Sequence, residues 1–323
     1  VVMDISIRSC HNENNSCYAC YKFPSGISMD TNLLNAFIVV ADKKSFSEAA
    51  FELYLTQSAV SKRVTQLENI IGAKLFDRLG RRIELTDAGK RFYPRARLIV
   101  SEVKDALLAV TVDQGLVSGE LSVATSHHIG LHRLPEILKE YKRSYPKVDL
   151  NLSFMASEAA YDMVIDGKVD LAVATLSANK HQAISITKVW DDPLVCVCGS
   201  EHPIANLTTC SADTLIKHPA LLPEKGTITR IIIERWFEEQ SLTITTTMET
   251  NYLETLKTMT SVGLGWSILP KVMVDAGLNS IDIPGLRVHR ALGIVTHKNK
   301  TMSPAANAFI QMVQTPSSQK ICN

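Results

Sequence analysis

The sequence predicts a small, mainly α-helical domain at residues 29–86, a long connecting helix at 87–115, and an α/β domain of two lobes at 116–318. Three observations support this prediction. Apolar residues recur at helical spacing through the first two segments. From Gly119 onward, short apolar runs alternate with helical patterns, which is typical of a parallel sheet flanked by helices. The chain of 323 residues is long enough for two domains.

The composition is that of an ordinary globular protein, with 46% hydrophobic and 21% charged residues. No apolar run reaches the roughly 18 residues of a transmembrane helix, and the N-terminal segment lacks the apolar core of a signal peptide. We therefore expect no membrane partner and a cytoplasmic location. Residues 1–28 show little periodicity, and we expect them to be a disordered tail or sequence upstream of a native start at Met29.

The seven cysteines, an odd number, argue against a disulfide framework. Cys196 and Cys198 lie two apart in a run typical of a buried strand, and such neighbours are too far apart to bridge comfortably. A zinc site in the tail is an open alternative, because three cysteines lie near a histidine there, but the usual second Cys/His pair is missing. These residues are Cys10, His11, Cys17 and Cys20. We expect no bound metal.

Charge is unevenly distributed along the chain. Residues 29–97 hold twelve basic and eight acidic side chains, a net charge of +4, whereas the rest of the chain carries a net charge of −3. A basic domain attached to a slightly acidic one is typical of a nucleic-acid-binding module joined to a sensor. A basic but merely solvated surface would give the same balance.

Three helices are predicted in the first domain. The first, from Asp30, has one apolar face formed by Leu33, Leu34, Phe37, Val40 and Ala41. Ser45 followed by Glu48 is a capping-box pattern that begins the second helix. Thr56 caps the third helix, which Gly72 ends.

The third helix has two distinct faces. Val60, Val64, Leu67 and Ile71 share the inward face. The outward face is small and polar with a single cation, which suits insertion into a DNA major groove. A solvated helix face is the alternative, although such faces more often carry Glu–Lys pairs.

The segment after the third helix alternates around Gly80, which predicts a short hairpin with arginines near its tip, able to contact phosphates or the minor groove as a wing. Thr86 then caps the long helix, in which Pro94 predicts a bend or a later start. An apolar seam along this helix predicts dimerisation, and packing on its own domain is the alternative. The seam consists of Tyr93, Ala96, Ile99, Val103, Ala106 and Val110.

The α/β domain is expected to divide into a first lobe at about 119–188 and 296–318 and a second at about 189–295, with crossings near 186–195 and 287–296. Polar residues follow the ends of the predicted strands and open helices of the second lobe, where open α/β sheets bind ligands. Hydroxyl groups at helix N-termini suit an anion such as a carboxylate, sulfate or phosphate, although each could simply cap its helix. The candidate effector-binding residues are Thr125, Ser126, His127, Ser157, Thr175, Thr227, Thr229 and Thr250.

Several motifs occur in an order that resembles one family. "SFSEAA", "LTQSAVSKRVTQLE", "GAKLFDR" and "RRIELTDAG" follow one another at 45–89, and "GELSVATSHHIGLHRLPEIL", "DGKVDLAVAT" and "VGLGWSILP" come later. The chain resembles the LysR-type transcriptional regulators over roughly residues 29–313. The resemblance implies a winged helix-turn-helix (mainly α) DNA-binding domain plus an α/β two-lobed, periplasmic-binding-protein-like effector domain, joined by a long linker helix.

The resemblance also implies a homotetramer built from dimers, double-stranded DNA and RNA polymerase as partners, and a small-molecule co-inducer, with no cofactor, bound between the lobes. From the outward face of the third helix and the hairpin we expect DNA contacts, with Arg63 on a phosphate. The candidates are Gln57, Ser58, Ser61, Lys62, Arg63, Thr65, Arg78, Arg81 and Arg82.

Three other classes of protein explain the sequence less completely. An enzyme is disfavoured because the sequence has no GxSxG, P-loop, HExxH or dinucleotide glycine motif, and we expect no catalytic residues. A ligand-binding protein without DNA function would leave the basic helical domain unexplained. A structural DNA-binding protein would leave the two-lobed domain without a purpose.

Overall fold

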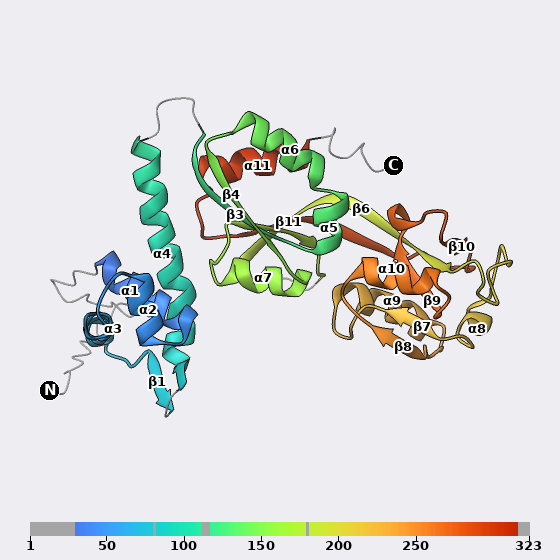
Figure 1. The fold of residues 1–323 in the computed structure, drawn as a ribbon, viewed down its shortest axis with the longest axis horizontal. Helices are drawn as coiled ribbons and strands as arrows, with labels where there is room; N and C mark the ends of the chain where they lie inside the picture. Colours follow the sequence, from blue (N-terminus) through green and yellow to red (C-terminus); the bar gives the residue numbers. More distant parts are fainter. Residues whose placement is uncertain (1–29, 80–81, 112–116, 179–180, 316–323) are drawn as a thin grey trace, which may run out of the picture.

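The computed structural model describes residues 30–79, 82–111, 117–178 and 181–315. The chain runs from the helical head through its long helix into the first lobe, then into the second lobe, and finally back to the first (Figure 1). The sequence-based fold class is confirmed in each part. Among the described residues, no helix combines the length and apolar composition that crossing a bilayer requires.

The head contains three helices and a hairpin. The elements are α1 (Thr31–Lys43), α2 (Phe46–Glu52), α3 (Gln57–Ile71), β1 (Phe76–Leu79) and β2 (Arg82–Leu85). The predicted caps are present: Ser45 accepts a hydrogen bond from the Glu48 backbone N–H, and Thr56 from that of Ala59. Gly72 ends α3 at φ 75°, a conformation that L side chains rarely adopt.

A single apolar core holds the head together. The inward faces of the three helices meet there, and the core is completed by the residue that precedes β1. Phe37, Val60, Leu67 and Leu75 are fully buried in it. Ile71, also expected inside, is half-buried at its edge.

The long helix α4 (Asp87–Thr111) begins where Thr86 predicted. The Thr86 hydroxyl accepts from the Gly89 backbone N–H at 2.9 Å and donates to the Lys74 carbonyl at 2.7 Å. Pro94 lies inside the helix, so the alternative of a later start is wrong.

The predicted seam of α4 divides into two parts. Tyr93 and Ala96 are buried in the core of the head, as the packing alternative expected. Ile99 and Val103 are 42% and 41% exposed, and Leu107, one position beyond Ala106, is 65% exposed. Val110 belongs to the part of α4 whose side chains are outside the described residues.

The first lobe is a sheet covered on both faces by helices. Its elements are β3 (Gly119–Thr125), α5 (His127–His132), α6 (Pro135–Ser144), β4 (Val148–Phe154), α7 (Ser157–Ile165), β5 (Leu171–Thr175) and α11 (Pro304–Gln314). One face packs against α6 and α11, and the other packs against α7 (Figure 1). The helical pattern of residues 131–146, "LHRLPEILKEYKRSYP", predicts a single helix there, but α5 ends before Pro135, which begins α6.

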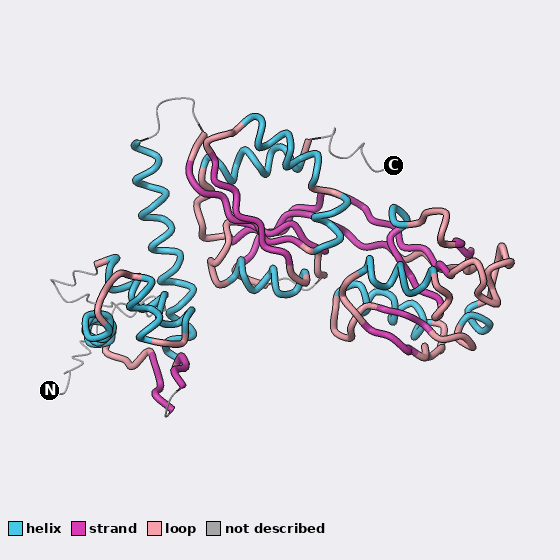
Figure 2. The backbone as a smooth tube through the Cα atoms, in the orientation of Figure 1, coloured by secondary structure: helices cyan, strands magenta, loops and turns pink. Residues whose placement is uncertain are grey.

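Two long strands connect the lobes. β6 (Ile184–Cys198) and β11 (His289–His297) pair antiparallel, and both run from one lobe toward the other (Figure 2). The parallel arrangement expected for the sheet holds for β3, β4 and β5, whereas β11 is antiparallel to β5. Residues 292–296 already pair with β5, so the return to the first lobe comes before residue 296.

The second lobe is built around the distal part of β6. Its further elements are α8 (Ala212–Leu215), β7 (Ala220–Leu222), α9 (Ile228–Glu239), β8 (Thr246–Glu249), α10 (Leu253–Ser261), β9 (Trp266–Pro270), the 3-10 turn η1 (Lys271–Met273) and β10 (Asn279–Ile281). Separate apolar clusters lie under α9 and α10. Cys196 and Cys198 are unbridged and buried in β6, which confirms the strand expected there.

Candidate functional site

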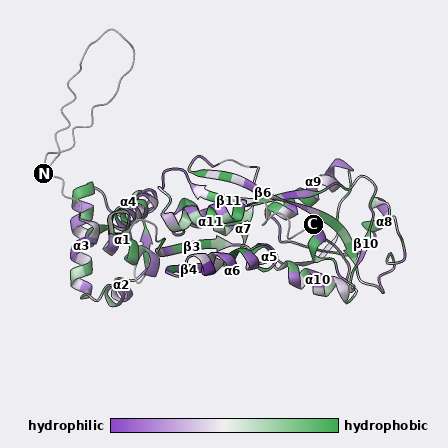
Figure 3. Ribbon diagram, turned by 90° about the horizontal axis from the view of Figure 1, so that it is seen from above, coloured by the Kyte–Doolittle hydropathy of each residue, from purple (hydrophilic) through white to green (hydrophobic). Residues whose placement is uncertain are grey.

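The outward face of α3 is the first candidate site. Gln57, Ser58, Lys62 and Thr65 are exposed, and Ser61 and Arg63 are half-exposed. Along its length α3 carries both hydrophilic and hydrophobic residues (Figure 3). Because the hydrophobic side chains of α3 are buried in the core of the head, its polar side chains remain available to a partner.

The hairpin is fixed to the end of α3 by a buried carboxylate. Glu68 accepts from the Leu75 backbone N–H at 2.9 Å and from the Lys74 ammonium at 2.6 Å. This sets the direction in which the chain enters β1. Arg78 lies in β1 and Arg82 in β2, opposite Leu79, whereas Arg81 lies outside the described residues.

The second candidate site is a cavity of about 270 Å³ between the two lobes. Six of the eight predicted effector-binding residues line it: Ser126, His127, Ser157, Thr175, Thr227 and Thr229. The structure therefore brings together side chains that are up to about a hundred positions apart in the sequence. The first four come from the first lobe, and the last two from the second.

The other two predicted residues lie outside the cavity lining. Thr125 is fully buried, and its hydroxyl donates to the Val173 carbonyl at 2.9 Å. The Thr250 hydroxyl accepts from the Tyr252 backbone N–H at 3.3 Å. Both hydroxyls have local structural roles.

The capping interpretation also holds for some residues that do line the cavity. Ser126 accepts from the Ile129 backbone N–H and Thr227 from that of Arg230, so both cap helices. These hydroxyls are therefore fixed in orientation at helix N-termini that open toward the cavity.

A buried cluster of charges reaches the cavity through Arg290, and sequence reasoning missed it. Asp192 accepts from Arg133 at 3.0 Å and from Nε of Arg290 at 2.7 Å. Nη1 of Arg290 donates to the Thr229 hydroxyl of the second lobe at 3.1 Å. Two guanidinium groups share one carboxylate, which leaves an excess of one positive charge.

Arg290 has an unsatisfied donor at this site. The residue is 4% exposed and lines the cavity, and its Nη2 has no hydrogen-bond partner. Burial lowers the pKa of Arg290, while the nearby Asp192 carboxylate raises it. Leaving a charged donor buried without a partner is costly, so the site favours an acceptor that carries negative charge.

His128 lies beside this cluster and is neutral. Burial, assisted by the charges of Arg290, His132 and Arg133, lowers the pKa of His128 to about 2. Neither ring nitrogen has a hydrogen-bond partner, and Nε2 lies 3.8 Å from a carboxylate oxygen of Asp192.

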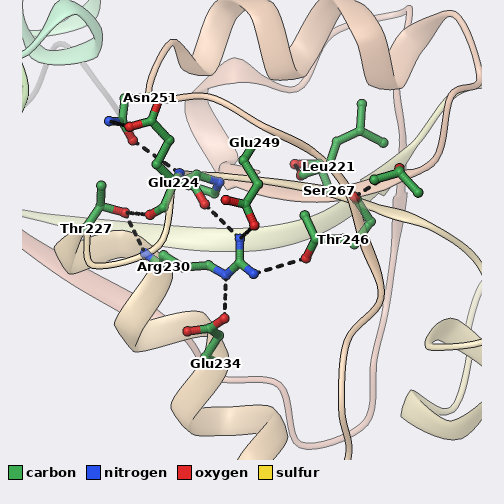
Figure 4. A network of polar contacts seen from close by, with 12 residues as sticks. Leu221, Glu224, Thr227, Arg230, Glu234, Thr246, Glu249, Asn251 and Ser267 are labelled. Atoms are coloured by element: carbon green, nitrogen blue, oxygen red, sulfur yellow. Dashed lines mark hydrogen bonds and ion pairs between the residues drawn. The ribbon is translucent and has the colours of Figure 1, made fainter.

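The wall of the cavity in the second lobe is shaped by Arg230, which is buried in α9. Its guanidinium contacts Glu234 at 2.7 Å, Thr246 at 3.0 Å and Glu249 at 3.3 Å (Figure 4). It also donates to the Pro223 carbonyl, which fixes the segment before α9. That segment carries Glu224 and Thr227 into the lining.

One hydrogen bond already joins the lobes across this wall. Glu158, on α7, accepts from the Ile228 backbone N–H at the start of α9 at 2.7 Å. A carboxylate thus occupies the N-terminus of α9, which is a natural anion site. The Ile228 backbone N–H at this helix end therefore already has a hydrogen-bond partner within the chain.

Charge alone could not have identified the missed residues. Asp192 and Arg290 face each other in the register of β6 and β11, but β6 also carries Lys188 and Asp191. Buried charges are paired, and only the strand register and the burial show which of these charges form the pair.

Comparisons with known proteins identify both domains of the chain. Residues 31–90 match the model of the bacterial regulatory helix-turn-helix proteins of the lysR family, and residues 114–316 match that of the LysR substrate binding domain. The HTH-type transcriptional activator CmpR of Synechocystis is 30% identical over 280 residues, which cover 85% of this chain and 91% of that protein.

Two solved structures share the fold. A full-length OxyR variant from Pseudomonas aeruginosa has a TM-score of 0.72 at 20% identity, and covers 92% of this chain and 97% of its own. Full-length CbnR complexed with its target DNA has a TM-score of 0.59 at 22% identity, and covers 90% of this chain and all of its own. The match of both family models, in order and over most of the sequence, shows that this chain belongs to the LysR family of DNA-binding transcription regulators.

Proposed function

We propose that this chain binds specific DNA sites through α3 and is switched by a small anionic effector bound between its lobes. The exposed polar face of α3 is the observation that carries the DNA part. Gln57, Ser58, Ser61, Lys62 and Thr65 present short donors and acceptors to base edges. Arg63 and the arginines of the hairpin, Arg78, Arg81 and Arg82, contact phosphates.

The unsatisfied guanidinium of Arg290 supports an anion as the effector. A carboxylate, phosphate or sulfate group would accept from Nη2 and offset the excess positive charge of the cluster. Ser126, Ser157, Thr175 and Thr229 would supply further hydrogen bonds. Because Arg290, in the connecting strand β11, contacts Thr229 of the second lobe and shares Asp192 with Arg133 of the first, binding there would change how the lobes are held.

The remaining parts of the proposal follow from this function. A single head contacts little DNA, so useful affinity requires paired heads, and we propose a homodimer that assembles into a homotetramer. RNA polymerase is the proposed protein partner, and the cytoplasm is the proposed location because the DNA is there. The proposed role is regulation without catalysis.

Mapping of bound DNA across the source genome tests the DNA part. Wild-type chain is compared with the Ser58→Ala/Lys62→Ala double variant, with Lys139→Ala, an exposed lysine of α6, as the control. Discrete sites that are lost in the double variant and kept in the control are expected. Sites that persist in the double variant would contradict the assignment of α3.

Thermal unfolding with a panel of small compounds tests the effector part. Small mono- and dicarboxylates, phosphate and sulfate are compared with uncharged amides of the same carboxylates. We expect at least one anion to raise the unfolding midpoint while its uncharged amide does not. The Thr229→Val variant should show a smaller rise with the same anion. A preference for the amides would contradict the anionic class.

A further inference from the structure

His128, His132 and Glu254 form a cluster that the proposed function does not use. One ligand atom from each of these three residues lies within 4.8 Å of the others. His132 Nε2 lies 2.6 Å from a carboxylate oxygen of Glu254, and the rings of His128 and His132 are 4.9 Å apart. No bound metal is expected from the sequence at this position.

The arrangement follows from the local fold. His128 and His132 are four residues apart on α5, so they lie on the same side of the helix, one turn apart. Glu254 is in the first turn of α10, in the other lobe. Nothing in the sequence would have indicated this partner, because it is more than a hundred positions away.

We propose that His128, His132 and Glu254 bind a divalent transition-metal ion such as Zn²⁺, and that the ion joins the two lobes. Two imidazoles and a carboxylate are a donor set that Zn²⁺ and its neighbours prefer over Mg²⁺ or Ca²⁺. Donor atoms around tetrahedral Zn²⁺ lie about 3.3 Å apart, so the donors, which lie within 4.8 Å of one another, would move together when the ion binds.

His128 is the observation that points to a ligand. It is 5% exposed, and its two ring nitrogens have no hydrogen-bond partner. An unsatisfied buried polar group is costly, and coordination by a neutral imidazole would relieve that cost. The Asp192 carboxylate, 3.8 Å away, can orient the ring as carboxylates do for metal-binding histidines.

The charges and access of the cluster also fit a cation. The Glu254 carboxylate supplies the negative charge among the three donors, and Asp192 pairs with the guanidinium groups of Arg133 and Arg290 nearby. The side chains of His132 and Glu254 are 27% and 42% exposed, so an ion can enter from solvent. With the ion bound, α5 and α10 are held together at the edge of the effector cavity.

Zinc titration of the full chain tests this site. Cys10, Cys17 and Cys20 are first replaced by serine, because thiolates there would compete for zinc. His132→Ala and Glu254→Gln are then made in this background, since both positions are partly exposed and tolerate change. His289→Ala, an exposed histidine of β11, is the matched control.

One equivalent of Zn²⁺ is expected to bind the background chain and the control with similar affinity, measured by competition with a chromogenic chelator. Each of His132→Ala and Glu254→Gln should weaken binding at least about tenfold and abolish the zinc-induced rise in unfolding midpoint. Absence of saturable binding in the background, or unchanged binding in both variants, would overturn the proposal. Loss of zinc binding in His132→Ala but not in Glu254→Gln would contradict the proposal that the ion joins the two lobes.

Discussion

Lys62 is the one cation on the exposed polar face of α3, among the residues that the structure describes there. Lys62→Ala is expected to weaken binding to a mapped DNA site by roughly 5- to 150-fold, the range for loss of one base or phosphate contact. Fluorescence anisotropy with a labelled duplex measures this change. The salt dependence identifies the contact, because loss of a phosphate contact lowers the slope of log affinity against log salt by about one.

Lys139→Ala is the control for this measurement. It removes an equally exposed positive charge from α6 in the first lobe, where it pairs loosely with Glu136. Equal affinity losses in the two variants would mean that net charge, and not the face of α3, sets DNA affinity.

A second prediction concerns the reactivity of the buried cysteines. Burial raises the pKa of Cys198 to about 11, and the pKa of Cys196 is raised still further by burial and by its neighbouring thiols. Because the thiolate is the reactive form, both should resist iodoacetamide at pH 8 in the folded protein. Peptide mapping by mass spectrometry checks this, with urea-unfolded protein as the fully reactive control. Rapid labelling of Cys196 in the folded chain would contradict its burial.

Among the elements, β11 depends on Gly293. The register against β6 shifts between Leu292 and Gly293, and a Cβ at this glycine would lie 2.1 Å from the Thr187 carbonyl oxygen. Gly293→Ala is therefore expected to lower the free energy of unfolding by about 1–3 kcal/mol, because backbone must move to make room. Urea denaturation followed by circular dichroism measures the loss.

Gly277→Ala is the comparison for this prediction. A Cβ there would meet nothing closer than 3.4 Å, so stability should change by no more than about 0.5 kcal/mol. If the two variants are equally stable, the close approach of β6 and β11 does not require glycine.

Most elements could be predicted from the sequence because local signals define them. Ser45, Thr56 and Gly72 are capping residues whose effect is set within one helical turn, and the structure places all three as expected. The split between α5 and α6 was missed although Pro135 marks it, because apolar periodicity continues across the break. The antiparallel direction of β11 depends on distant partners, and no local pattern encodes it.

At the scale of the whole molecule, α4 presents an exposed apolar stripe. Ile99, Val103 and Leu107 are between 41% and 65% exposed on one helix, which is unusual for a surface that stays in water. Val103→Glu is expected to shift the protein toward monomer, because a carboxylate would be buried in the dimer interface. Light scattering coupled to size-exclusion chromatography measures the shift.

Lys139→Glu is the control for this experiment, since it introduces the same carboxylate on exposed α6 with an even larger change of net charge. It should leave the molar mass unchanged. An unaltered mass for Val103→Glu would show that α4 does not mediate assembly.

The cavity between the lobes could be predicted only in part. Hydroxyls such as Ser126 and Thr227 were identified because they sit at helix starts, which the sequence marks. Arg290 was missed because its role arises from the packing of the two lobes. His132 and Glu254 belong to the same class of contact, made by tertiary structure alone.

The paired strands β6 and β11 have a mechanical consequence. Their hydrogen bonds fix the spacing of the two strands, whereas a two-stranded ribbon twists more readily than a wide sheet. Both strands run from one lobe to the other, so the length of their extended backbone sets the distance between the lobes. Twisting of the ribbon instead rotates one lobe relative to the other. Asp192 and Arg290 face each other within this ribbon, so a ligand bound to Arg290 would contact the segment whose twist sets that rotation.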